Sequence, residues 1–166
     1  MVKLKHILIA LIAVGLCLFA VLYLSPSEEK KVRKQFDLLS EYVSKDSNEN
    51  AIAMANKMQK LGSLFGDSCE LKIAVELLSG TYTREEIASY AARARARFSK
   101  VSLGFHDLEV TFPENGVAKV TLTARLTGQT RAGEQMRETR ELECLLEKKE
   151  KKWRLNRIEV IEVLRK

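Results

Sequence analysis

The chain has 166 residues, of which 28 are basic, 22 are acidic and 46% are hydrophobic, and its formal net charge is +6. This length fits one domain with an appendage. Basic and acidic residues are interleaved in segments such as Glu138–Glu143 and Lys148–Lys152, which indicates a solvated surface and not a continuous nucleic-acid-binding stripe. We therefore expect no nucleic-acid partner.

An uncharged run, Ile7–Leu24, is long enough to cross a bilayer with modest thinning. It also exceeds the roughly 7–15 apolar residues of a signal-peptide core. No pair of small residues near its end forms a cleavage site. The sequence therefore predicts an uncleaved transmembrane helix within a membrane anchor, residues 1–27, followed by one domain, residues 28–166.

The charges that flank this run bear on its orientation. Lys3 and Lys5 in the short N-terminal head favour a single-pass protein of the inner membrane with its domain on the extracytoplasmic side. Lys30–Lys34, just after the run, argue for the opposite orientation. These residues would also suit anionic headgroups, at about 1 kcal/mol per residue, although a solvated first helical turn is the simpler interpretation.

Three helices are predicted in the domain. The first begins near Glu28 and carries one apolar stripe at a 3.6-residue period. The second takes its N-cap from Asp46–Asn48 and presents an apolar face that includes Ile52. The third opens with a capping box at Thr83–Glu86 and ends near Ser99.

Five strands are predicted from alternating apolar residues. One, Cys69–Leu77, precedes the third helix, and four fill Val101–Leu164. The apolar parity shifts near His106–Asp107 and again within Trp153–Leu164, as it does at a β-bulge. Pro113–Gly116 contains an Asn-Gly pair, which predicts an antiparallel hairpin. The fold class is therefore α+β, in the order ααβαββββ.

This element order, the Gly80–Ile87 start of the third helix and the closing Trp153–Val160 resemble the nuclear transport factor 2-like superfamily, which includes ketosteroid isomerase and polyketide cyclases. The resemblance covers about Lys31–Leu164. It implies a cone-shaped domain, in which three helices pack in a curved, mostly antiparallel sheet. It also implies a pocket at the open end of the cone and a homodimer through the outer sheet face.

The catalytic candidates are Asp107, Tyr42 and Tyr90. In isomerase-like members of that superfamily, a carboxylate base faces an oxyanion hole built from a tyrosine and a protonated acid. No catalytic motif of the superfamily matches these residues one by one, so the resemblance assigns them no roles. Asp107 also suits a solvent-facing or bulge-capping position, and that interpretation is favoured.

Glu138, Arg140 and Arg157 are the candidates for a ligand pocket. Glu138 and Arg140 share the parity of the apolar face at Leu142–Leu146, which would place them at the mouth of the cone. The alternative is a cross-strand ion pair at the end of the sheet. Both alternatives stay open at this point.

The sequence predicts no metal site and no cofactor. It has no histidine pair and no Cys-x-x-Cys motif, so metal ligands at a working spacing are missing. Cys69 and Cys144 lie on apolar strand faces. They could be bridged if their Cα atoms lie within about 7 Å, but two buried free thiols are favoured.

Two functions from different classes follow. The favoured one is a membrane-anchored, non-enzymatic binding or assembly module that uses the cone pocket or the sheet face for a small ligand or a protein partner. The alternative is a small-molecule isomerase, cyclase or lyase that uses a carboxylate in the cone pocket. An enzyme of that kind predicts an apolar pocket with converging polar groups and a carboxylate of shifted pKa.

Overall fold

The computed structural model describes residues 27–73 and 79–163. Contacts within the chain divide it into Met1–Lys31 and Val32–Lys166, and the α+β fold belongs to the second unit. The predicted transmembrane helix, Ile7–Leu24, lies outside the described residues. Among the described residues, no helix is both long and apolar enough to span a bilayer.

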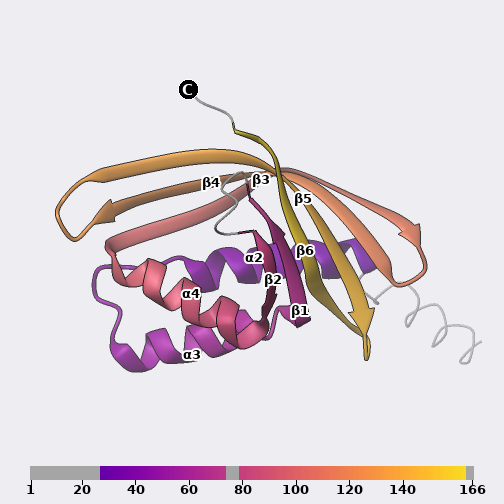
Figure 1. The fold of residues 1–166 in the computed structure, drawn as a ribbon, viewed down its shortest axis with the longest axis horizontal. Helices are drawn as coiled ribbons and strands as arrows, with labels where there is room; N and C mark the ends of the chain where they lie inside the picture. Colours follow the sequence, from indigo (N-terminus) through magenta and orange to yellow (C-terminus); the bar gives the residue numbers. More distant parts are fainter. Residues whose placement is uncertain (1–26, 74–78, 164–166) are drawn as a thin grey trace, which may run out of the picture. The chain divides into compact units, whose positions relative to one another are not determined.

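The described residues form three helices and six strands. In chain order they are α2 (Glu28–Val43), α3 (Ala51–Gly62), β1 (Phe65–Lys72), β2 (Gly80–Thr83), α4 (Arg84–Ala96), β3 (Phe98–Glu114), β4 (Val117–Thr130), β5 (Gln135–Lys149) and β6 (Lys152–Val163). The strands form one curved sheet in the order β2-β1-β6-β5-β4-β3, antiparallel except between β1 and β6 (Figure 1). The predicted α+β class and mostly antiparallel sheet are confirmed.

The sheet has one strand more than predicted. The prediction of a single strand at Cys69–Leu77 is wrong, because β1 begins four residues earlier and β2 returns antiparallel to it. The Ser79 hydroxyl, just before β2, makes two hydrogen bonds with Ile73, just after β1. It accepts from the Ile73 N–H at 3.0 Å and donates to the Ile73 carbonyl at 2.7 Å. With only four residues, β2 is too short to show a recognisable alternation.

Both predicted bulges are confirmed. The register between β3 and β4 shifts between His106 and Glu109, where Asp107 has a φ of 51°. In β6 a shift falls at Asn156, because the residues on either side of it pair with consecutive residues of β5. Each extra residue turns the later side chains over, so the apolar ones stay on the helix side while the strand bends.

In two tight hairpins, the turn residues adopt left-handed backbone conformations with positive φ. Gly116, at a φ of 80°, closes the β3–β4 hairpin that the Asn-Gly pair predicts. Between β5 and β6, Glu150 and Lys151 have φ angles of 49° and 66°, a region that glycine and asparagine occupy more easily. This turn therefore keeps two charged side chains at positions of unfavourable backbone geometry.

The core lies between the helices and the inward face of the sheet. Val32 and Phe36 of α2 are 0% and 1% exposed, and the Phe36 ring packs edge-to-face on Phe105 of β3 with centroids 5.5 Å apart. Leu146 and Leu155, on neighbouring strands, have no exposed surface. Burial of each such side chain contributes about 1.5–3 kcal/mol, so this interface stabilises the domain strongly.

The second predicted helix exists, but its predicted cap and face are partly wrong. Asn50 is the N-cap of α3, because its Oδ1 accepts from the Ala53 N–H at 2.8 Å, and Asp46–Asn48 precede it. Ile52 is 75% exposed, whereas Met58 is buried. The apolar face of α3 is therefore confined to its C-terminal half, which packs against α4.

A buried ion pair joins α4 to the loop between α2 and α3. The Arg95 side chain is 3% exposed, and its Nη2 donates to the Glu49 carboxylate at 2.8 and 3.0 Å. Its Nε donates to the Val43 carbonyl at 2.8 Å and its Nη2 to the Ser44 carbonyl at 2.9 Å. The carboxylate also accepts from Lys57 at 2.9 Å. These bonds fix the loop against the C-terminal end of α4.

Candidate functional site

The inward face of the sheet continues beyond the core toward the β4–β5 hairpin. On β5, the inward parity of Leu142 extends to Arg140 and then to Glu138. The strand register places Arg140 opposite Ala124 and Glu138 opposite Leu126. Both candidates therefore lie on the helix-facing side of the sheet, next to its apolar surface, as their parity predicts.

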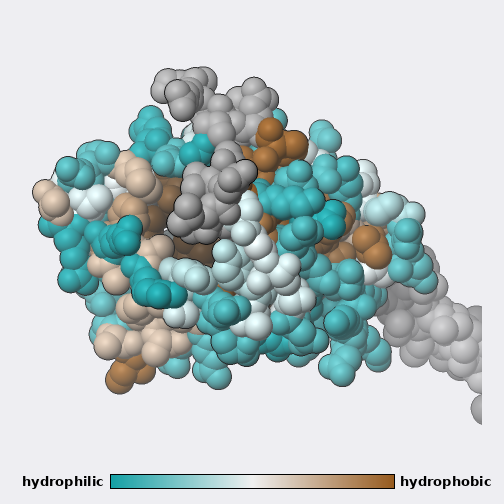
Figure 2. All heavy atoms as spheres, viewed as in Figure 1, coloured by the Kyte–Doolittle hydropathy of each residue, from teal (hydrophilic) through white to brown (hydrophobic). Residues whose placement is uncertain are grey.

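Several apolar residues on this part of the inward face are only half-buried, although Ala124, opposite Arg140, is buried. We call this region the inward recess and define it by Leu126, Leu142, Ile158 and Val160. Deeper on the same face, Leu146 and Leu155 are fully buried. Figure 2 shows hydrophobic side chains set back between hydrophilic ones on the side that it draws. The inward recess thus keeps part of its apolar surface exposed among the described residues.

The charges at the rim of the inward recess neutralise each other. Arg140 Nη2 lies 2.8 Å from Glu138 Oε2, and the two side chains are 35% and 48% exposed. This pair lies along one strand, not across two. An exposed pair of this kind contributes little stability, about 0–1 kcal/mol.

The structure places Arg157 on the opposite face of the sheet. Its Nε lies 2.6 Å from Glu70 Oε2, in the register that joins β1 to β6. The two side chains are 39% and 37% exposed. Arg157 therefore links the parallel strand pair on the outward face and does not reach the inward recess.

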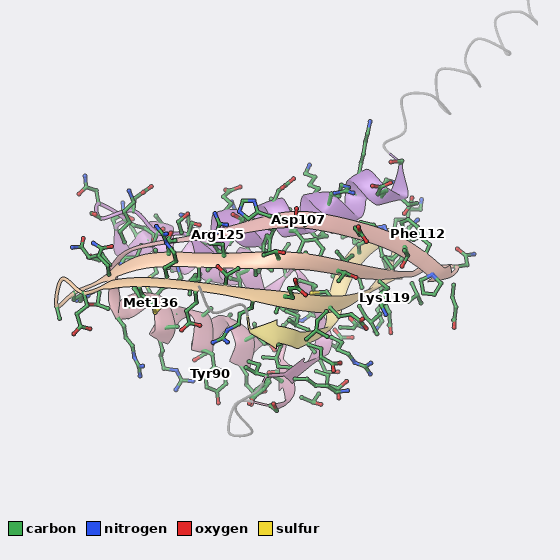
Figure 3. The ribbon with its side chains drawn as sticks, turned by 90° about the horizontal axis from the view of Figure 1, so that it is seen from above. Tyr90, Asp107, Phe112, Lys119, Arg125 and Met136 are labelled. Carbon is green, nitrogen blue, oxygen red and sulfur yellow. The ribbon has the colours of Figure 1, made fainter. Side chains whose placement is uncertain are left out.

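Asp107 also lies on the outward face, exposed at the bulge of β3, where Thr123 Oγ1 donates to its Oδ2 at 3.4 Å. Figure 3 looks onto this face, with the helices behind the strands, and labels Asp107 and Arg125 on it. Tyr42 packs against the core from α2. Tyr90 of α4 is 49% exposed. The sheet thus separates the carboxylate of Asp107 from the helices that carry both tyrosines.

Tyr90 takes part in an aromatic cluster instead. Its ring packs edge-to-face on Tyr82 of β2 with centroids 5.4 Å apart, and the Arg93 guanidinium lies 4.6 Å above it. Contacts of this kind contribute about 0.5–1.5 kcal/mol each. The cluster therefore stabilises the packing of β2 on α4.

The carboxylates with shifted pKa values serve structure. Burial alone would raise the pKa of Glu49, but its hydrogen bonds with Lys57 and Arg95 outweigh burial and lower it. The Thr83 backbone N–H and hydroxyl lower the pKa of Glu86 in the capping box, which confirms that prediction. A catalytic acid needs a raised pKa, and neither residue lies on the inward face of the sheet.

The two cysteines of the domain are free and buried. Burial raises the pKa of the Cys69 thiol and of the Cys144 thiol to about 12. Both thiols are therefore protonated at neutral pH and poor nucleophiles. Among the described residues, no group of histidines, cysteines and carboxylates could hold a metal ion.

Two polar features escaped the sequence analysis. The buried Arg95 had a usable signal, because Ile87, Ala91 and Arg95 follow one another at i, i+4 and i+8. The second feature is a polar cleft of about 400 Å³ beside the start of α4, lined by Gly66, Asp67, Arg84, Lys149, Glu150 and Arg154. These residues come from three separate segments, so no sequence spacing predicts the cleft.

Comparison with known proteins shows the fold. No family model and no curated protein matches the chain. Solved structures do match. A hexachlorocyclohexane dehydrochlorinase (LinA) Type2 has a TM-score of 0.64 at 12% identity, covering 83% of this chain and 88% of that one. A protein of the NTF2-like family from Streptomyces avermitilis has a TM-score of 0.63 at 13% identity, covering 84% and 99%.

An uncharacterised protein with a cystatin-like fold from Caulobacter vibrioides has a TM-score of 0.60 at 12% identity, covering 82% of this chain and 92% of that one. At these identities the likeness shows the fold alone. The chain therefore has the nuclear transport factor 2-like fold, as the sequence resemblance implies.

Proposed function

We propose that the chain is a non-enzymatic binding module, held at a membrane by residues 1–27, whose inward recess takes an apolar small ligand or an apolar side chain of a protein partner. One observation carries the proposal. The inward recess is apolar and half-buried, and its rim charges, Glu138 and Arg140, pair with each other. Such a surface suits binding by apolar contact, with orientation set by the two rim residues.

The enzymatic alternative lacks a base in the right place. Asp107 is exposed on the outward face. On β5, Glu138 lies at an inward position, and its carboxylate pairs with Arg140. General base catalysis needs a carboxylate about 3 Å from the atom that carries the proton, or one water molecule away. The fold neighbours include a dehydrochlorinase, which makes an eliminating enzyme the second candidate.

The homodimer through the outer sheet face stays a prediction. That face carries ion pairs, such as Lys119 with Glu143 at 2.8 Å, and threonines. Obligate dimer interfaces are more apolar than this. We therefore place the binding function on the inward face.

The test is a titration of the full chain in uncharged detergent with indole, a small neutral aromatic molecule, followed through side-chain methyl resonances. We expect saturable shifts at Leu142 and Ile158, which line the inward recess. Ile52 is the matched control, because its methyl groups are 75% exposed on α3; detergent partitioning shifts it without saturation. Equal behaviour at all three residues would refute the proposal.

A further inference from the structure

The polar cleft carries more positive than negative charge. Arg84, Lys149 and Arg154 line it against two carboxylates, Asp67 and Glu150. Its volume of about 400 Å³ falls within the range of small-molecule sites. The cleft lies on the start of α4, the β5–β6 turn and neighbouring residues of β1 and β6, apart from the inward recess.

One cation of the cleft is left over. Arg84 Nη2 contacts Asp67 Oδ1, and Lys149 Nζ lies 3.6 Å from Asp67 Oδ2. Arg154 has no ion-pair partner among the residues that the structure describes, although Glu150 lines the same cleft. A guanidinium offers a planar fork of donors that matches a phosphate or carboxylate. Arg154 is therefore available to an external anion.

Asp67 forms only weak ion pairs with Arg84 and Lys149. Its side chain is 77% exposed, and those of Arg84 and Lys149 are 36% and 58% exposed. Solvent screens such pairs, so an anion of higher charge can displace the carboxylate. The Asp67 carboxylate thus marks the position that an external anion would take between these two cations.

In the first turn of α4, the Glu86 N–H already bonds to the Thr83 hydroxyl of the capping box, so it is not open to an anion. The β5–β6 turn does contribute. It brings Lys149 and Glu150 to the cleft, and the surrounding Lys148–Lys152 segment has four lysines and one glutamate. The local charge therefore favours anions over cations.

We propose that this cleft binds a phosphate group, with Arg154 and Arg84 as its guanidinium ligands and Lys149 as a third cation. The phosphate group belongs either to a soluble phosphate ester or to a phospholipid headgroup. This site is independent of the inward recess, so either proposal can fail without the other.

The test uses the full chain in uncharged detergent and follows the arginine Nε–Hε resonances. One arm titrates inorganic pyrophosphate at constant ionic strength. The other arm adds short-chain phosphatidylglycerol, with phosphatidylcholine as the lipid of zero net charge. We expect saturable shifts at Arg84 and Arg154 and none at Arg125, an exposed arginine of β4 outside the cleft. Saturation with pyrophosphate assigns a soluble source, and saturation with phosphatidylglycerol alone assigns the lipid.

Variants make the assignment specific. Arg154→Gln should weaken binding about tenfold, since it removes a charge-assisted contact. Asp67→Asn should strengthen binding about threefold, because the competing carboxylate is gone. Arg125→Gln makes the same charge change outside the cleft and should leave the affinity unchanged. Absence of saturation in both arms, equal losses in the two arginine variants, or weaker binding by Asp67→Asn would overturn the proposal.

Discussion

Replacing Arg95 by methionine tests the buried ion pair most sharply. The change keeps an unbranched side chain of similar length and removes the guanidinium from Glu49 and from the Val43 and Ser44 carbonyls. Removing one partner of a buried pair costs about 3–5 kcal/mol. Lys57 still neutralises Glu49, and the buried Arg95 Nη1, which has no hydrogen-bond partner, disappears. We therefore expect a value at the lower end of this range, a decrease of about 3 kcal/mol in the free energy of unfolding.

The assay is urea unfolding of the full chain, followed by the fluorescence of Trp153, the single tryptophan, which is 3% exposed. Arg93→Met is the matched control, two residues earlier on α4 with an exposed side chain. It should cost less than about 1 kcal/mol, the value of its contact with Tyr90. A double-mutant cycle then combines Arg95→Met with Glu49→Gln.

The two changes at the ion pair should not add. Glu49→Gln alone leaves Arg95 buried without its counter-charge, whereas the double variant removes both charges. We expect its loss to fall short of the sum by about 1–2 kcal/mol. Strict additivity, or a loss below about 1 kcal/mol for Arg95→Met, would refute the view that this pair holds the loop to α4.

Three further predictions concern stability. The pKa of Glu49 in the folded protein lies below its ordinary value of 4.5. Ionised Glu49 therefore stabilises the fold above pH 4.5, and this stabilisation is lost as the pH falls through the folded pKa. Glu49→Gln should therefore flatten the acid limb of a plot of urea midpoint against pH, and an unchanged limb would contradict this. Gly116→Ala forces alanine to a φ of 80° and should cost about 1 kcal/mol in urea unfolding; no loss would show that the turn rearranges. Thr83→Ala removes the cap of α4 and should cost about 1 kcal/mol, whereas Thr81→Ala, on exposed β2, should cost less.

Much of the fold could be predicted because burial leaves a period in the sequence. The parity shifts at Asp107 and Asn156 are visible as bulges, since each strand has one buried face. Leu142 and its neighbours likewise show which face of β5 points inward, and hence where Glu138 and Arg140 lie. The short β2 could not be predicted, because pairing with β1 defines it and its own side chains do not.

The charged residues were less predictable. Asp107 and Arg157 are candidates because of their residue type, and strand parity alone does not say which end of a face stays partly exposed. Arg95 occupies a helix position that periodicity marks as buried, yet its charge argues against burial until Glu49 is known to face it. The polar cleft depends on three segments that only the tertiary fold brings together.

The most direct test of the binding proposal compares the affinity of two variants for indole. Leu142→Trp fills the inward recess, and Asp107→Asn removes the carboxylate on the other face of the sheet. The account predicts that Leu142→Trp abolishes the saturable shift at Ile158 and that Asp107→Asn leaves its midpoint unchanged. Retained binding in Leu142→Trp, or lost binding in Asp107→Asn, would contradict it.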